Sequence, residues 1–266
     1  MNREFAESFL KYQVFDNEFI NFDPLSKMNI LFSLGLSGLI VRDWRYGFSL
    51  CLLWGLLSVI IGKGKPFFKI FGVLFLFFGL FTLILRQFSV RGSTVLFSLF
   101  GRFDITEEAL INGLNVSSSM LCFSGAIVLF FIITEIRDLM YSLEKKGVSH
   151  TVSYIMLASF QTIKDLKKNT NTIMESQKAR GIETEGSIKN RMKAFFPVLG
   201  PLILGAISGT EEKLIAMDAR AFSVECPHSF LRELRPVPFY EKIITAAVDI
   251  FALAAVAYKI FTVFAK

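Results

Sequence analysis

The sequence predicts an all-α integral membrane protein with about five transmembrane helices and a long cytoplasmic helical segment before the last of them. Hydrophobic residues make up 53% of the 266 residues and charged residues only 20%, whereas soluble domains average about 25% charged residues. Five apolar stretches approach the length of a bilayer crossing, and a charged segment, 135–222, separates the last from the others. The net charge of +6 fits the excess of Lys and Arg in cytoplasmic loops. We therefore expect a lipid bilayer, and not nucleic acid, as the environment of the chain.

The three cysteines predict neither a disulfide scaffold nor a metal site. Cys51 and Cys122 lie in apolar stretches and suit small core positions. Cys226 and His228 form a lone pair without the second pair of ligands that a zinc site needs. We expect no metal and no cofactor. Segment 1–27 lacks the apolar core of a signal peptide and is expected to be cytoplasmic.

The first two crossings are predicted at 28–41 and 48–61, after an N-cap at Asp23 and a proline, Pro24, at the first helical position. Each stretch is shorter than the ~20 residues of a full crossing. One re-entrant hairpin therefore remains an alternative. The aromatic residues between the two stretches suit the membrane interface and favour two short crossings.

The next two crossings complete the first membrane segment, 28–134. Stretch 67–85 would span about 28 Å as a helix, enough for the hydrocarbon core. Thr106 is placed to cap a helix that runs to 133, with two glutamates in its first turn. Four crossings return the chain to the cytoplasm. The last crossing, within 243–266, then leaves the C-terminus outside.

Two long helices are predicted within 135–222, after a short helix at 134–148. The first runs from a cap at Ser149 to Gly181 and carries an apolar stripe at helical spacing. The second is interrupted by prolines and glycines over 192–209, which predicts a kinked helix that grazes the bilayer. A loop, 223–242, leads to the last crossing.

Each of these two helices ends in an arginine between small residues, Ala179-Arg180-Gly181 and Ala219-Arg220-Ala221, and the two motifs are 40 positions apart. A basic residue at a helix C-terminus commonly just offsets the helix dipole, by ~0.3–1 kcal/mol. Two copies, each followed by a loop, favour a role in binding. The planar guanidinium suits a carboxylate or carbonyl cleft, and the small neighbours allow close approach of another backbone.

These motifs resemble the signature of the transmembrane T component of energy-coupling factor (ECF) transporters. This family of ABC-type importers includes the membrane subunits of cobalt, nickel, biotin and other vitamin importers. Asp23-Pro24-x-x-Lys27 before the first crossing is similar to a family motif, as is Leu143-x-x-x-Gly147-Val148 at the end of helix 134–148. The resemblance covers nearly the whole chain. One departure is Pro227-His228-Ser229, where family members often carry an Arg-Thr pair.

The resemblance implies crossed cytoplasmic coupling helices whose tips dock into two ATP-binding cassette ATPase subunits. By position, Arg180 and Arg220 take the docking roles. It further implies a separate substrate-binding membrane subunit, the S component, and uptake of a vitamin or a transition-metal ion across a bacterial cell membrane.

Two other classes of function, a membrane enzyme and a self-sufficient secondary transporter, make different demands on the sequence. The chain has no phosphate-binding Gly-x-x-x-x-Gly-Lys-Ser/Thr loop, so we expect a non-catalytic subunit that relies on partner ATPases. A membrane enzyme would need clustered ionisable residues, and Asp249 and Lys259 are ten positions apart, too far around and along a helix to pair. A self-sufficient secondary transporter remains the alternative.

Overall fold

The computed structural model describes residues 19–89, 95–99, 103–182, 188–222, 224 and 237–264. The chain divides into two compact units, Met1–Gly147 with Arg232–Lys266, and Val148–Leu231. The predicted all-α class is confirmed. One small exception is an antiparallel pair of strands, β1 (Val95–Leu99) and β2 (Phe103–Thr106).

The first unit holds the apolar helices. Their bounds in chain order are α2 Pro24–Val41, α3 Trp44–Ile60, α4 Gly64–Leu74, the π-helical turn η1 Phe75–Leu80, α5 Phe81–Ser89, α6 Glu107–Ile133, the short α7 Ile136–Lys145, and α10 Phe239–Phe264. Within the described residues, four helices are long and apolar enough to cross a membrane, namely α2, the continuous α4–η1–α5, α6 and α10. At 17 residues, α3 is apolar but shorter, so each of the five predicted stretches forms a helix.

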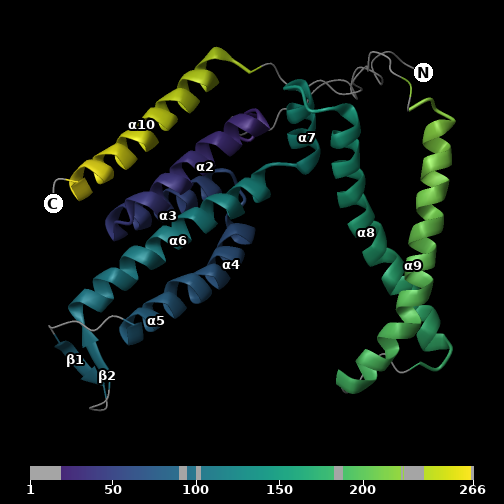
Figure 1. The fold of residues 1–266 in the computed structure, drawn as a ribbon, viewed down its shortest axis with the longest axis horizontal. Helices are drawn as coiled ribbons and strands as arrows, with labels where there is room; N and C mark the ends of the chain where they lie inside the picture. Colours follow the sequence, from purple (N-terminus) through teal and green to yellow (C-terminus); the bar gives the residue numbers. More distant parts are fainter. Residues whose placement is uncertain are drawn as a thin grey trace. The chain divides into compact units, whose positions relative to one another are not determined.

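Helix α6 is the centre of this unit, with α2 and α3 on one side and α4 and α5 on the other (Figure 1). Glycines allow the close approach. A Cβ atom at Gly38 would lie 2.6 Å from the Cys122 sulfur, and one at Gly47 would lie 2.7 Å from the Ser118 side chain. Trp54 is completely buried and donates from Nε1 to the Cys122 carbonyl over 3.2 Å. Small residues on α6 thus let three helix backbones pack tightly, as in membrane bundles.

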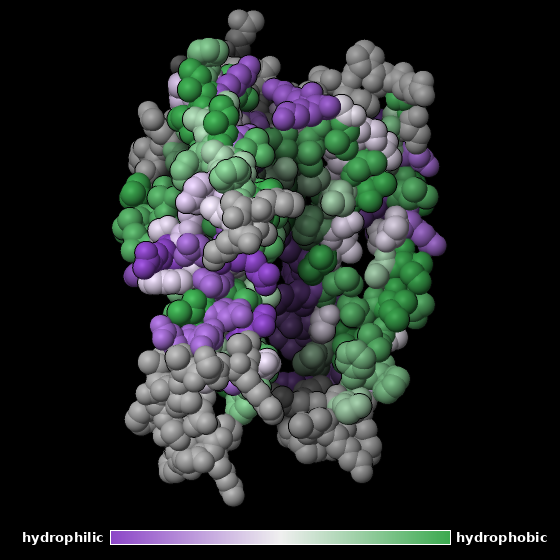
Figure 2. Space-filling model, turned by 60° about the vertical axis from the view of Figure 1, so that its left-hand side comes forward, coloured by the Kyte–Doolittle hydropathy of each residue, from purple (hydrophilic) through white to green (hydrophobic). Residues whose placement is uncertain are grey.

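The outer helices leave their apolar surfaces uncovered. Only 6% of the most apolar part of α4–η1–α5 is buried, and the same holds for α10. On the face shown in Figure 2, hydrophobic residues form large continuous areas. Such surfaces are stable against lipid hydrocarbon and not against water, which is what an integral membrane protein requires.

The capping predictions can be compared with the helix ends. Asp23 accepts a hydrogen bond from the Leu25 N–H over 3.1 Å, and Pro24 opens α2, as predicted. Ser149 caps the second unit's first helix by accepting from the Val152 N–H. Thr106 is the N-cap residue of α6, but its buried hydroxyl has no partner among the described residues. The helix start was therefore predicted correctly and its capping bond was not.

The second unit is an antiparallel pair, α8 (His150–Ala179) and α9 (Ile188–Asp218). Although Pro197 and Pro201 lie inside it, α9 is one continuous helix. It changes direction in its first half (Figure 1), where the missing N–H groups and the ring volume of the prolines distort a helix.

Candidate functional site

The first arginine motif ends α8 in a Schellman turn. Arg180 is the C-cap residue. The Gly181 N–H donates to the Lys178 carbonyl over 2.9 Å, and the Ile182 N–H donates to the Gln177 carbonyl over 3.1 Å. Gly181 has φ +85°, the left-handed conformation that this motif requires and that glycine adopts without steric cost.

The second arginine motif ends α9 in the same turn, with every participant 40 positions further along. The Ala221 N–H donates to the Asp218 carbonyl over 3.0 Å, and the Phe222 N–H donates to the Met217 carbonyl over 3.1 Å. Arg220 therefore occupies the C-cap position. The left-handed residue here is Ala221, with φ +57°, a conformation that costs an L-residue roughly 1–2 kcal/mol.

All six residues of the two predicted motifs are exposed, namely Ala179, Arg180, Gly181, Ala219, Arg220 and Ala221. Neither guanidinium has an ion pair or a hydrogen-bond partner within the part of the chain that the structure describes. We call these two exposed helix ends the first tip (179–181) and the second tip (219–221). Each tip presents an unpaired guanidinium beside small side chains, an arrangement that allows a protein partner to surround the arginine.

The two tips lie at opposite ends of the second unit (Figure 1). Gln177, three residues before the first arginine, contacts Pro197 in the first half of α9. From Pro197 to Arg220 the helix advances 23 residues, or roughly 35 Å at 1.5 Å per residue. A separation of this size suits two distinct binding partners or two well-separated clefts.

A polar contact that the sequence analysis did not find fixes the first tip to α9. Gln177 is buried, at 7% exposure, and its Nε2 donates to the Pro197 carbonyl over 3.3 Å. In a regular helix this carbonyl would accept from residue 201, but Pro201 has no N–H. Two prolines four positions apart were the signal in the sequence, because they leave an acceptor free for a neighbouring helix.

A cluster of polar side chains joins three helices of the first unit. The Asp23 N–H donates to Glu241 Oε1 over 2.9 Å, and the Ser142 hydroxyl donates to Asp23 Oδ1 over 3.1 Å. Lys27 donates from Nζ to the Ile20 carbonyl over 2.7 Å. Lys27 and Glu241 are 4% and 1% exposed. Asp23 of the predicted family motif thus links the start of α2 to α7 and α10, and Lys27 of the same motif binds the chain just before α2. Removing one buried charge would leave its surroundings poorly compensated.

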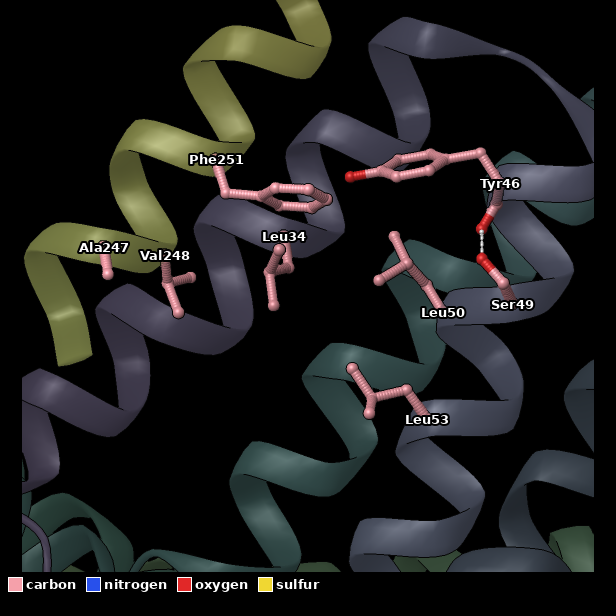
Figure 3. Close-up of a pocket in the computed structure, with 8 residues that line it drawn as sticks. All are labelled: Leu34, Tyr46, Ser49, Leu50, Leu53, Ala247, Val248 and Phe251. Atoms are coloured by element: carbon pink, nitrogen blue, oxygen red, sulfur yellow. Dashed lines mark hydrogen bonds between the residues drawn. The ribbon is translucent and has the colours of Figure 1, made fainter.

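An apolar cavity of about 500 Å³ lies between α2, α3 and α10. Figure 3 shows its lining: Leu34, Tyr46, Ser49, Leu50, Leu53, Ala247, Val248 and Phe251. Its hydroxyls are already satisfied, because Tyr46 shares a hydrogen bond with Ser37 over 2.8 Å and Ser49 donates to the Tyr46 carbonyl over 2.7 Å. Because the remaining lining is apolar, the cavity suits hydrocarbon better than a polar cargo.

Asp249, in the last helix, is paired with a residue of another helix. Asp249 accepts a hydrogen bond from Asn29 Nδ2 over 2.6 Å, a partner that sequence spacing could not reveal. Across residues 19–89, 103–182, 188–222 and 237–264, no group of three or more metal-ligating side chains comes together. Cys226 and His228 lie outside the described residues.

Comparison with known proteins identifies the family. The family model described as CbiQ, cobalt transport protein, matches residues 22–229, a range that includes both tips. The chain belongs to the CbiQ cobalt transport protein family. Proteins described as energy-coupling factor transporter transmembrane protein EcfT are similar to it. The one from Listeria innocua is 30% identical over 210 residues, covering 75% of this chain and 78% of its own length.

Two further EcfT proteins give the same result. The Macrococcus caseolyticus protein is 26% identical over 224 residues, covering 80% of this chain and 83% of its own length. The Bacillus subtilis protein is 32% identical over 152 residues, covering 54% and 57% respectively. The predicted resemblance is confirmed: the chain is a transmembrane T component of the energy-coupling factor transporter family, a bacterial membrane subunit of a transporter.

Proposed function

We propose that this T component uses Arg180 and Arg220 to dock two ATP-binding cassette ATPase subunits. It would pass their ATP-driven motion to a separate substrate-binding S component that carries a vitamin or a transition-metal ion. The single observation that supports this most strongly is the repetition of one helix-ending turn, with an exposed arginine at the same position of each copy.

The contribution of each tip to binding depends on whether its arginine is buried by the partner. An arginine exposed to water contributes little by itself, because surface ion pairs contribute about 0–1 kcal/mol. Buried in a complementary cleft, the same group becomes an anchor, and truncating one partner of such a buried pair costs about 3–5 kcal/mol. The separation of roughly 35 Å between the tips supports one ATPase for each tip.

For this role the second unit must lie in the cytoplasm, where ATP is available. The proposed orientation follows from charge: α8 carries Lys164, Lys167 and Lys168 on its exposed surface, and basic segments remain on the cytoplasmic side. The connection to the membrane unit runs through α7, whose Ser142 is bonded to Asp23. Motion of α8 would therefore reach α2 through a short, hydrogen-bonded route.

The experiment is a double charge reversal, Arg180→Glu with Arg220→Glu, in the full-length chain co-expressed with the ATPase and S subunits of its source organism. We expect the variant to insert normally, to lose the ATPases on purification in mild detergent, and to lose substrate uptake. Lys164→Glu with Lys168→Glu is the matched control, because it makes the same change in charge on the exposed face of α8. Intact ATPase binding and uptake in the arginine variant would refute the proposal.

The same preparation separates this proposal from a self-sufficient secondary transporter. Vesicles that contain the chain alone should show no substrate accumulation, and accumulation in the complete complex should require ATP. Accumulation by the isolated chain in response to an ion gradient would favour the secondary transporter.

A further inference from the structure

The residue that follows the second tip packs against the other helix of the pair. The Phe222 ring lies 4.9 Å, centroid to centroid, from the Tyr154 ring and 5.3 Å from the His150 ring. His150 and Tyr154 are four positions apart and share one face of the first turns of α8. The last residue of the turn that ends α9 is thus attached to the beginning of α8.

The geometry of these rings is that of attractive aromatic contacts. The interplanar angles are 53° with Tyr154 and 40° with His150, and both centroid distances fall within the ~4.5–7 Å range of favourable aromatic pairs. All three residues are partly buried. These ring contacts do not depend on a pair of opposite charges, so salt should weaken them less than it weakens a surface ion pair.

Phe222 is also rigidly connected to the arginine. Its N–H donates to the Met217 carbonyl over 3.1 Å and closes the turn that contains Arg220. Only one residue, Ala221, separates the two side chains, and its backbone is fixed in the left-handed region. The direction in which Arg220 leaves the helix is therefore coupled to where the Phe222 ring rests.

The corresponding residue after the first tip is Ile182. It is partly buried, but it is aliphatic and cannot make a ring contact of this kind. The first tip is instead tied to α9 by the hydrogen bond from Gln177 to Pro197. The two tips therefore share the same backbone turn and differ in the contact that attaches each helix end to the other helix.

We propose that Phe222 is a positioning residue for Arg220, because its packing on His150 and Tyr154 fixes the angle at which the second tip meets its ATPase. Helices α8 and α9 then move as one body at this end. The inference rests on the docking function proposed above and adds to it a residue that itself touches no ATPase.

The first test measures the helices alone. Spin labels at Val152 and Ile215, both exposed, report the distance between the start of α8 and the end of α9 in the full-length chain in nanodiscs. Phe222→Ala should at least double the width of the distance distribution, whereas the matched Ile182→Ala should leave it unchanged. Phe222→Tyr should keep it narrow. Tyr154→Leu removes the contact from the other helix, so it controls for a folding defect at the end of α9 and should broaden the distribution too.

The second test measures docking by one tip at a time. In an Arg180→Ala background only the second tip binds an ATPase, and Phe222→Ala should weaken that binding by roughly two- to tenfold, the size expected for loss of an aromatic contact. In an Arg220→Ala background it should have no effect. An unchanged distance distribution, or unchanged second-tip binding, would overturn the positioning role. If Arg220→Ala itself left ATPase binding unchanged, the docking function would fail, while the distances would still report on the aromatic cluster.

Discussion

The first and second tips share a backbone turn and differ in almost everything that supports it. At the first tip the left-handed residue is Gly181, and a hydrogen bond from Gln177 ties the helix end to Pro197. At the second tip the left-handed residue is Ala221, and an aromatic contact of Phe222 makes the attachment. The comparison shows that the exposed arginine and its turn are the common element, while each helix supplies its own means of holding them.

The difference also suggests unequal mechanical properties. A single hydrogen bond contributes about 0.5–1.5 kcal/mol and breaks with a small change in distance. The two ring contacts of Phe222 contribute about 0.5–1.5 kcal/mol each beyond the area they bury, and they favour particular orientations of the rings. The second tip, however, has an alanine in a conformation that glycine would adopt more easily. The turn at the second tip is therefore stabilised more by the packing of Phe222 against α8 than by the conformational preference of Ala221.

The largest expected effect comes from removing one arginine at a time. Arg180→Ala and Arg220→Ala should each weaken binding of an isolated ATPase subunit to the purified chain by about 100-fold or more, the equivalent of 3–5 kcal/mol for a buried paired charge. Each should be milder than the double reversal. Arg→Lys at either position should recover part of the loss, because the charge remains but the planar fork does not. If every single variant bound the ATPase as tightly as the unmodified chain does, the two arginines would not be the anchors.

Gly181→Val should have the next largest effect. A β-branched residue at φ +85° would destabilise the turn by about 1–2 kcal/mol or more. Amide hydrogen exchange at residues 180–182 should become correspondingly faster, by roughly five- to thirtyfold. Lys178→Val, a β-branched substitution at a residue with right-handed helical backbone, is the control and should change the exchange far less. Unchanged exchange in Gly181→Val would contradict a left-handed Schellman turn at the first tip.

Gln177→Leu should have a smaller effect, and the size of this effect should depend on whether residue 201 is proline. Loss of the hydrogen bond to Pro197 should cost about 0.5–1.5 kcal/mol, seen as faster exchange in the last turn of α8. In a Pro201→Ala background the new N–H can bond the Pro197 carbonyl along α9, so the same substitution should cost markedly less. Equal costs in the two backgrounds would show that Pro201 does not free the acceptor.

The smallest effect has the opposite sign. Ala221→Gly should slow amide hydrogen exchange at positions 221 and 222, because glycine removes the cost of the left-handed conformation. The gain should be about 0.5–1 kcal/mol, after the greater freedom of glycine in the unfolded chain is subtracted. Faster exchange would indicate that the methyl group of Ala221 has a packing role.

The sequence predicts the fold class, the helices and the positions of both tips because these depend on local patterns. Apolar stretches, an Asp-Pro start at Asp23 and Pro24, and a helix that runs to Gly181 are all readable along the chain. Contacts between distant segments are not. Glu241 meets Asp23 across 218 positions, and Asn29 meets Asp249 across 220, and a single sequence does not show which polar residues will face each other.

In the candidate site, too, the local patterns could be predicted and the contacts between distant segments could not. The two arginines were found because the motif repeats, but neither Gln177 nor Phe222 was recognised as a support. Gln177 read as part of the apolar stripe, and its acceptor becomes visible only when the two prolines of α9 are placed opposite it. Phe222 is one of 30 phenylalanines in an apolar chain, so its identity carried no signal until the ends of α8 and α9 were brought together.

The central claim is that the two tips enter partner ATPases, and crosslinking from the tips tests it most directly. A photoreactive amino acid would be placed at Ala179, at Ala219 and, as a control, at the exposed Asn169 in the middle of α8, in the complete complex in membranes. We predict that the first two positions crosslink to ATP-binding cassette subunits and that Asn169 does not. Crosslinks from both tips only to other parts of the same chain, or to lipid, would contradict the account.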